Sequence, residues 1–347
     1  MTDTRIEKYV FLRGGRYRVK LPSSVLKERH LGTFDTLEQA RTARDREIAR
    51  HRDRENKPTI SGLTNEYQGQ SIDDLWNQAY SAQSISVQRE ELRNNQQITI
   101  PNPGLAFGIA WLSDSHFGSN ETDYKSLRHD AEIVRDTPRL YAEFHGDGCD
   151  NWINAKLAHL QRGQALQFDG EVRLFASWLD MLRDKWIAIV CGNHDNWTKK
   201  LSGFDQVRQA LDGAQVLYDS DEVCFTLVYG DNRQNVKLRH KWKYSSIFNP
   251  THAIEVGWQR GGFDFDIGVG GHTHIGTVDR PFYRHGKRRH AVLTGTYKIL
   301  GSAFGRQIGA APSQDSGCGV SIFRPNGGYA FFDDLETGAE FLKFLNR

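Results

Sequence analysis

The chain has 347 residues, a length that favours one large domain with a smaller module. Its 38% apolar and 25% charged residues are typical of a soluble globular protein, and no apolar run approaches the roughly 20 residues that span a bilayer, so we expect no membrane partner. The net charge is +2, but residues 1–60 carry 15 Lys or Arg against 9 Asp or Glu, a local +6 that leaves −4 elsewhere and indicates a polyanion-binding module.

The cysteines show no CxxC spacing, so neither a zinc ribbon nor a disulfide framework is expected. They are Cys149, Cys191, Cys224 and Cys318. The N-terminus lacks an apolar segment before a cleavage site, which argues against secretion. We therefore expect reduced thiols and a cytoplasmic location, that of the host cell if a phage or prophage encodes the chain.

Residues 9–52 are predicted to form short strands followed by one helix. The segments GRYRVKL and RHLGTFDT are typical of strands, and DTLEQARTARDREIARH predicts a helix capped by Asp35 or Thr36. The apolar face of this helix contains Leu37, Ala40 and Ile48.

The order YRVKL…HLGTFDTLEQARTARD resembles the small DNA-binding domain of plant ethylene-response factors and the arms of phage integrases and homing endonucleases. The resemblance implies a nucleic-acid-binding module over residues 1–55, whose sheet enters a groove. Its contacts, phosphate binders more than base readers, would be Arg13, Arg16, Arg18 and Lys20. A docking module that binds no nucleic acid is the alternative.

Residues 56–97 are expected to form a linker and one amphipathic helix. The linker is polar and contains Pro and Gly, and Ser71 with Asp74 predicts a capping box at the start of the helix. Apolar residues follow at helical spacing, namely Ile72, Leu75, Trp76, Ala79 and Tyr80. We expect this stripe to pack on the large domain, with a partner as the alternative.

Over residues 98–347, short apolar strands are each followed by polar residues and a helical stretch. The strands are LAFGIAWLSDSH, RLYAEFHGDGCD, KWIAIVCGNHD and DFDIGVGGHTH. Alternating strands and helices imply a mainly parallel, buried sheet, and ligands gather at the carboxyl ends of such strands. The polar groups that fall there are Asp114, His116, Asp147, Asp150, Asn193, His194, Asp195, His272 and His274.

This mixture of carboxylate, imidazole and amide groups suits a divalent ion such as Mn, Fe or Zn. One ion needs about four such groups, and more than four are present, so two ions that share a carboxylate are expected. Two ions roughly 3.5–4 Å apart bind both oxygens of a phosphoryl group and create a hydroxide nucleophile near neutral pH. Manganese is the first expectation, with Fe, Zn, Ni or Mg as alternatives.

The motifs DSH, GDGCD, GNHD, a lone His240 and GHTH match in order the signature of calcineurin-like metallophosphoesterases, over roughly residues 105–300. The chain is similar to this family, and the resemblance implies an α/β fold, a four-layer αββα sandwich behind the small N-terminal module. It also implies that Asp114, His116 and His274 bind the first ion, that Asp147 bridges, and that Asn193, His240 and His272 bind the second.

The resemblance places His194 beside the scissile phosphate, where it protonates the leaving oxygen or stabilises charge. Asp150 matches the carboxylate that orients this imidazole and would raise its pKa. A single His in a strand is more often structural than a ligand, so His252 is an alternative to His240. His145 is interpreted as a support of the ligands or as structural, and Asp195 as structural. Helix caps and turn formers would explain the Asp and Asn residues, but not four histidines in fixed places.

Asn and Trp follow GDGCD, where the Ser/Thr protein phosphatase branch has Arg and Gly, and the third motif has Asp where that branch has Glu. The arrangement is more similar to the repair nucleases and other phosphodiesterases. The hairpin DRPFYRHGKRRH, with its turn at residues 285–287, offers arginines to a phosphodiester. The candidate phosphate contacts are Arg280, Arg284, Arg288 and Arg289, with a solvated turn as the alternative. The candidates for base stacking are Trp152, Trp197 and Trp242, with core packing as the alternative.

The expected function is hydrolysis of phosphodiester bonds, those of nucleic acid in particular, by a hydroxide bound to two ions, with no covalent intermediate and with assistance from His194. A small-molecule or nucleotide phosphomonoesterase is the first alternative. A nucleic-acid-binding scaffold without catalysis is the second, although no ligand of the signature is missing.

Overall fold

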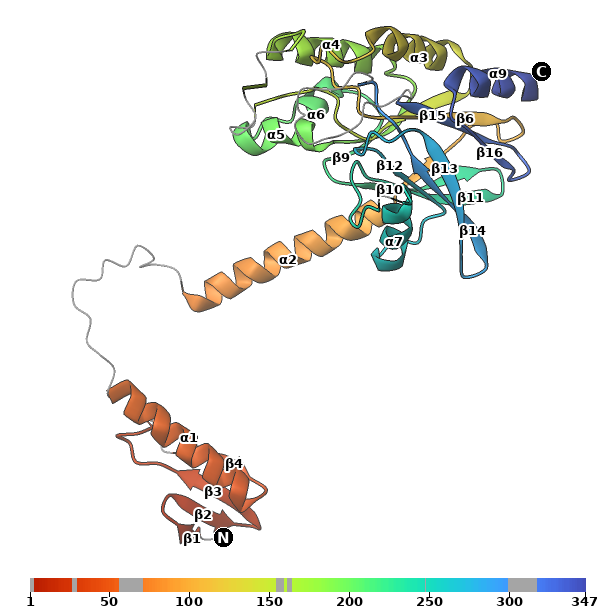
Figure 1. Cartoon of the computed structure of the whole chain (residues 1–347). Coiled ribbons are helices and arrows are strands. Elements are labelled where there is room, and N and C mark those ends of the chain that lie inside the picture. Colours follow the sequence, from red (N-terminus) through yellow and green to blue (C-terminus); the bar gives the residue numbers. More distant parts are fainter. Residues whose placement is uncertain are drawn as a thin grey trace. The chain divides into compact units, whose positions relative to one another are not determined.

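The computed structural model describes residues 3–26, 30–55, 71–153, 159–160, 164–246, 248–298 and 317–347. The chain divides into two compact units, Met1–Gln78 and Ala79–Arg347. Figure 1 shows the elements of both. Within the described ranges, no helix combines the length and apolarity that a membrane span requires. The linker expected over residues 56–70 lies outside these ranges.

The first unit contains a four-stranded antiparallel sheet, one complete helix and the start of a second helix (Figure 1). Two strands were expected and are present as β3 and β4, whereas β1 and β2 were not predicted. Thr36 caps the helix, because its side-chain oxygen accepts a 3.2 Å hydrogen bond from the Gln39 amide. The elements are β1 (Thr4–Glu7), β2 (Val10–Arg13), β3 (Arg16–Lys20), β4 (His30–Phe34) and α1 (Leu37–Glu55).

Strand alternation separates the two faces of this sheet. Val10 and Val19 are directly paired, fully buried, and form a small core with Ala40 of α1. Residues one position away point to the opposite face, since successive side chains alternate. The charged residues of β2 and β3 therefore lie on the face of the sheet away from α1. They are Arg13, Arg16, Arg18 and Lys20.

Helix α2 (Ile72–Asn94) begins with the predicted capping box. The Asp74 amide donates to the Ser71 hydroxyl at 3.0 Å, and the Ser71 amide donates to the Asp74 carboxylate at 3.2 Å. No residue of α2 is buried within its own unit, and Ile72 and Leu75 are 69% and 43% exposed. Packing of this stripe on the large domain stays a prediction.

The second unit is built on two mixed six-stranded sheets. The first has the order β16-β15-β6-β7-β8-β9, with β6 to β9 parallel. It contains β6 (Phe107–Leu112), β7 (Leu140–Phe144), β8 (Trp186–Val190), β9 (Leu217–Asp219), β15 (Cys318–Phe323) and β16 (Tyr329–Phe332).

The second sheet has the order β13-β14-β12-β11-β10-β5, with β11, β12 and β14 parallel. It contains β5 (Gln97–Thr99), β10 (Val223–Tyr229), β11 (Asn232–Leu238), β12 (Ile267–Gly270), β13 (Val278–Arg284) and β14 (Lys287–Leu293). The predicted hairpin turn is confirmed, since β13 and β14 are joined by His285 and Gly286, both with positive φ as a two-residue turn requires.

Buried side chains divide this unit into four layers (Figure 1). In β6, Ala110 and Leu112 face a core shared with three helices, while Ile109 and Trp111 face a core shared with the second sheet. The second sheet packs its other face on one further helix. The helices are α3 (Tyr124–Asp136), α4 (Phe168–Met181) and α9 (Leu335–Leu345) on one side and α7 (His252–Arg260) on the other, with α5 (Asn193–Ser202) and α6 (Gln206–Ala210) near α4.

The expected α/β class, with an αββα sandwich and a small N-terminal sheet, is therefore confirmed. All four cysteines are buried with free thiols, in agreement with the prediction of reduced cysteines.

Candidate metal centre

The polar motifs all lie just beyond the carboxyl ends of neighbouring strands. Asp114 and His116 follow β6, and Asp147 follows β7 in the same sheet. His240 follows β11 in the other sheet, where His272 and His274 follow β12. Parallel pairing within each sheet brings these ends to one edge of the sandwich.

The first cluster consists of Asp114, His116 and His274, whose ligand atoms all lie within 4.8 Å of one another. The His274 Nε2 is 2.8 Å from Asp114 Oδ1, and the Nε2 atoms of the two imidazoles are 3.3 Å apart. Asp114 and His116 are buried.

The second cluster consists of Asp147, His240 and His272, also within 4.8 Å. The His240 Nε2 lies 3.1 Å from Asp147 Oδ2 and 3.0 Å from His272 Nδ1. The lone histidine of the sequence pattern thus reaches the centre, whereas the alternative His252 is exposed on α7.

Asn193 is the first residue of α5, directly after Gly192. Its Oδ1 is buried and has no hydrogen-bond partner among the described residues, which is costly for an amide oxygen unless a ligand satisfies it. A Cβ added to Gly192 would lie 2.0 Å from Asp147 Oδ1, so only glycine allows the backbone to approach this carboxylate.

Hydrogen bonds on the far side of each ring orient the imidazoles. The His116 Nδ1 donates to Asp150 Oδ1 at 2.8 Å, and the His240 Nδ1 donates to the backbone carbonyl of His145 at 2.9 Å. In both residues the Nε2 therefore faces the cluster. Metal-binding histidines are commonly oriented in this way, by a hydrogen bond from the ring nitrogen that does not bind the metal. His145 is structural, as expected: it bonds Glu143 at 2.8 Å and Thr294 at 2.7 Å.

The backbone at these positions is mostly left-handed. Five of the seven expected ligands have a backbone φ between 45° and 70°, a region that residues other than glycine rarely adopt. They are Asp114, His116, Asp147, His272 and His274. Such strain concentrates at functional sites, because the surrounding structure must hold it.

The electrostatics of the centre favour bound positive charge. Burial opposes ionisation, yet His240 and His194 hold the pKa of Asp147 far below its usual range. Burial also opposes protonation of His240, but Asp147 and Asp114 raise its pKa to about 9. Burial and the nearby His240 lower the pKa of His272 to about 4.

The raised pKa values of His116 and His240 favour protons beside these carboxylates in the ion-free protein. Binding of divalent ions there would release them, as metal sites require. The unpartnered Asn193 oxygen, the converging ring nitrogens and the carboxylates fit the expected pair of ions.

His194 is buried beside the clusters, with its Nε2 3.9 Å from Asp147 Oδ2. Its Nδ1 donates to the backbone carbonyl of Asp150 at 2.5 Å. The expected contact with the Asp150 carboxylate is not seen, and burial lowers the pKa of His194 instead of raising it. The ring is enclosed by Trp197 and Trp152, whose centroids lie 4.2 and 4.9 Å away, so Trp197 positions the histidine.

The Asp150 carboxylate is a hub for three other donors. It accepts from His116 Nδ1 at 2.8 Å, from Trp152 Nε1 at 2.7 Å and from Lys298 Nζ at 2.8 Å. Lys298 is 8% exposed, and sequence reasoning missed it because it belongs to no motif and lies 148 residues from Asp150.

Asp195 links the second and third motifs. Its Oδ1 accepts from the Gly148 amide at 3.0 Å, and its Oδ2 accepts from the Gly192 amide at 2.8 Å. It therefore caps α5 and ties the loop after β7 to it, which agrees with the structural interpretation.

The basic hairpin does not reach the metal centre. Leu293 of β14 pairs with Gly270 at the carboxyl end of β12, whereas Arg284 pairs with Lys287 at the other end of the hairpin. Arg284 and Arg288 therefore lie toward the opposite edge of the sheet from the histidine ligands. Arg289 is buried and pairs with Asp264 at 2.9 Å.

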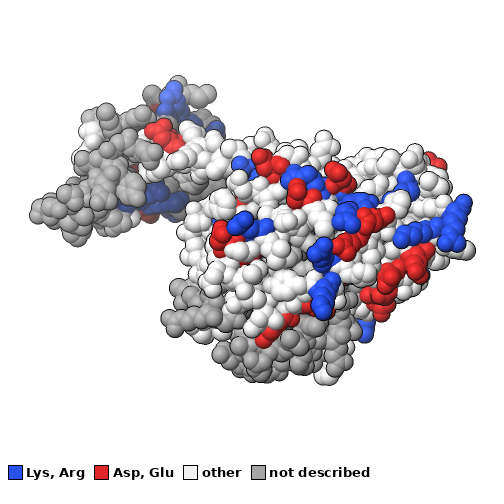
Figure 2. Space-filling view, turned by 90° about the horizontal axis from the view of Figure 1, so that it is seen from above, with Lys and Arg blue, Asp and Glu red and all other residues white. Residues whose placement is uncertain are grey.

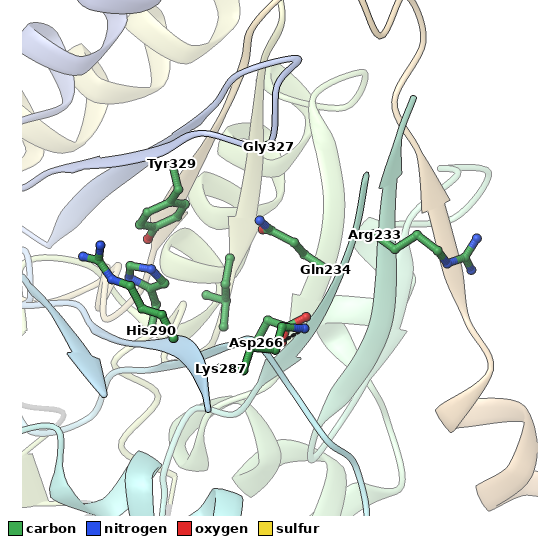
Figure 3. Close-up of a pocket in the computed structure, with 9 residues that line it drawn as sticks. Arg233, Gln234, Asp266, Lys287, His290, Gly327 and Tyr329 are labelled. Atoms are coloured by element: carbon green, nitrogen blue, oxygen red, sulfur yellow. Dashed lines mark ion pairs between the residues drawn. The ribbon is translucent and has the colours of Figure 1, made fainter. Parts of the chain in front are cut away.

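Arg288 instead lines a cavity of about 310 Å³ at that opposite edge. Figure 3 shows Gln234 and Tyr329 extending into it from opposite sides. Lys287 is paired with Asp266 at 2.6 Å, and Arg233 extends away from the cavity (Figure 3). Of its three Lys and Arg residues, Lys287 is therefore neutralised and Arg233 diverges, which leaves Arg288 to meet an anion there.

Charges of both signs alternate on the face shown in Figure 2. Ion pairs on α3, such as Arg128 with Glu132 and Arg135 with Asp136, are typical of this mixture. This face carries no continuous basic patch among the described residues.

No family model matches the sequence, and no curated protein matches it. Solved structures with similarity include the calcineurin-like phosphoesterase YfkN from Bacillus subtilis, at 13% identity and a TM-score of 0.34, over 70% of this chain and 99% of that chain. Vps29 from Chaetomium thermophilum has 11% identity and a TM-score of 0.33, over 65% and 93%. The nuclease MPE from Pseudomonas putida has 12% identity and a TM-score of 0.30, over 65% and 86%.

Proposed function

We propose that this chain is a dinuclear metallophosphoesterase of the calcineurin-like type, which hydrolyses phosphodiester bonds of nucleic acid. The observation that supports it is the pair of three-residue clusters at one edge of the sandwich, with an unpartnered amide oxygen and a buried histidine beside them. Bound ions would neutralise phosphoryl oxygens and activate water. Manganese is the first candidate, and Fe, Zn, Ni or Mg are the alternatives, because carboxylate oxygens suit Mn and Mg while imidazole nitrogens suit Fe, Zn and Ni.

The remaining chemistry belongs to side chains of this chain. His194 is neutral near pH 7, because burial lowers its pKa and its Nδ1 proton is held by the Asp150 carbonyl. Its Nε2 is therefore a proton acceptor in the free protein. A phosphoryl anion placed beside this atom would raise the pKa and allow it to carry a proton to the leaving oxygen.

The N-terminal sheet supports the nucleic-acid part of the proposal. Arg13 pairs with Arg16 across the hairpin, and Arg18 and Lys20 follow at alternate positions of β3. All four side chains therefore project from the face opposite α1. Two acidic partners, Asp3 and Asp35, form ion pairs with this face. The Arg16–Asp35 pair is exposed and weak, so a phosphate can compete for Arg16. Asp3 is part-buried and lies near Arg13, Arg18 and Lys20, so one carboxylate faces three cations and leaves an excess of positive charge on this face.

The catalytic proposal is tested by comparing four substrates with the manganese-loaded protein. These are bis(4-nitrophenyl) phosphate, 4-nitrophenyl phosphate, single-stranded DNA and double-stranded DNA. We expect turnover of the diester and of DNA to exceed that of the monoester. A preference for the monoester with inert DNA would favour a phosphomonoesterase, and no turnover of any substrate would favour the scaffold.

Nucleic-acid binding is tested with the double variant Arg13→Gln/Arg18→Gln. Loss of two phosphate contacts should reduce the slope of log K against log[salt] by about 1.8 for duplex DNA. Arg50→Gln, on α1 and away from the basic face, is the matched control. An unchanged slope in the double variant would remove the role of this sheet.

A further inference from the structure

A second cavity, of about 490 Å³, opens beside the metal centre. The second-cluster residue His272 lines it directly. Most of its wall is apolar and is formed by Trp242, Ala253, Ile254, Ile275 and Leu293. A volume of this size lies within the range of about 300–1,000 Å³ that is typical of small-molecule sites.

The wall of this cavity is preformed. Trp242 is 7% exposed, and its indole N–H donates to the Val269 carbonyl at 2.8 Å. A Cβ added to Gly257 of α7 would lie 2.4 Å from this ring, so helix and indole are in close contact. The loop before α7 is braced where Asn249 donates to Glu255 at 3.1 Å. A ligand therefore meets a wall that needs little reordering.

The rim of the cavity is polar on one side and apolar on the other. Lys241 is exposed on the rim, beside the hydroxyls of Ser245 and Ser246. Ile275 is 60% exposed on the wall, and Phe248, on the loop that lines the cavity, is 93% exposed. Exposed apolar side chains around a polar rim are typical of binding sites.

We propose that this cavity is the subsite for a nucleobase attached to the scissile phosphodiester. The inference rests on the proposed function and adds the part of the substrate that confers selectivity. A base combines apolar faces with a hydrogen-bonding edge, which matches the apolar wall and the rim of Lys241 and the serines. An acyl chain would match the apolar wall but would make no hydrogen bond with that rim. Because the base must leave its stack to enter, single strands and frayed ends are the expected substrates.

The test compares binding of thymidine 5′-monophosphate and methyl phosphate to the full, manganese-loaded chain by titration calorimetry. Both ligands offer the same phosphate to the metal centre, and only the first offers a base. We expect the nucleotide to bind about 10- to 100-fold more tightly, the range that base contacts with apolar rings provide. Equal affinities would overturn the inference.

Two variants locate the difference in this cavity. Ala253→Phe fills it, and Ile275→Ser removes part of its wall at an exposed position that folding does not depend on. Each should reduce the advantage of the nucleotide to less than about threefold. Gln259→Phe, on the exposed side of α7, is the matched control and should keep the advantage. If Ala253→Phe fails to fold by circular dichroism, Ile275→Ser carries the test.

The outcomes separate the two proposals. If the advantage persists in both cavity variants, the base binds elsewhere and the inference is wrong, while the phosphoesterase proposal stands on diester turnover. If manganese binds but neither ligand does, and bis(4-nitrophenyl) phosphate is not hydrolysed, both proposals fail together.

Discussion

Replacing Asp150 by Asn should damage both folding and metal binding, because this carboxylate serves two purposes. It compensates the buried charge of Lys298, and it accepts the Nδ1 proton of His116. Asn keeps the shape but loses the charge, so the Lys298 ammonium is left uncompensated. Removal of one partner from a buried pair costs about 3–5 kcal/mol in the free energy of unfolding. Loss of the group that orients a metal-binding histidine lowers metal affinity by about 10- to 100-fold.

A double variant separates these two effects. Lys298→Met leaves the Asp150 carboxylate with two N–H donors, His116 and Trp152. It should therefore lower the free energy of unfolding by less, on the order of 1–3 kcal/mol. In Asp150→Asn/Lys298→Met the unpaired ammonium is gone. The double variant should therefore lose about 0.5–3 kcal/mol less in the free energy of unfolding than the sum of the losses in the two single variants. Manganese affinity should stay low in the double variant, since the acceptor for His116 is still weakened.

The assay is urea unfolding of the metal-free protein in a chelator, so that stability is not mixed with ion binding. Manganese affinity is measured separately by titration calorimetry. An Asp150→Asn protein that unfolds at the wild-type urea concentration would contradict the charge argument. Recovery of metal affinity in the double variant would show that Asp150 does not act through His116.

Other substitutions test single links of the centre. Asp147→Asn removes the carboxylate between His240 and His194 and should weaken manganese binding by at least about 100-fold, as metal analysis would show. His194→Ala should lower diester turnover by about 10²- to 10⁴-fold at unchanged metal content; a loss of metal instead would make it a ligand. Burial, with the charge of Asp150, raises the pKa of Glu171 from near 4.5 to about 8. Between these pH values the folded state keeps a proton that the unfolded state has lost. The free energy of unfolding therefore falls as the pH rises from 4.5 to 8. Glu171→Gln should therefore be more stable than wild type by a few kcal/mol at pH 8.5 but not at pH 4.5, and equal urea midpoints at pH 8.5 would refute this.

The convergence of the candidate ligands could be predicted because the information is local. Each motif combines an apolar strand with polar residues at its end, and strand ends of parallel sheets meet at one edge. The lone His240 was predicted through the family resemblance, and it reaches the centre because β11 pairs in parallel with β12. The capping box of α2 and the turn of the β13–β14 hairpin were predictable for the same local reason.

What could not be predicted depends on pairing between distant segments. Arg284 and Arg288 are close to GHTH in the sequence, but β13 runs seven residues away from the centre, about 20 Å at 3.3 Å per residue. Lys298 meets Asp150 only because the chain after β14 returns to the loop after β7. The Asp150 side chain was assigned to His194, yet the backbone carbonyl of the same residue makes that contact.

Both clusters draw their side chains from both sheets of the sandwich. Asp114 and His116 come from one sheet and His274 from the other, and Asp147 faces His240 and His272 across the same boundary. Ions held here would join the two sheets by coordination bonds, in addition to the apolar packing and the hydrogen bonds that already cross this boundary, such as that from His240 to the His145 carbonyl. Loss of the ions would then remove catalysis and weaken the contact between the two sheets at the same time. On ion binding, amide hydrogen exchange should become slower in β6 and β12 together.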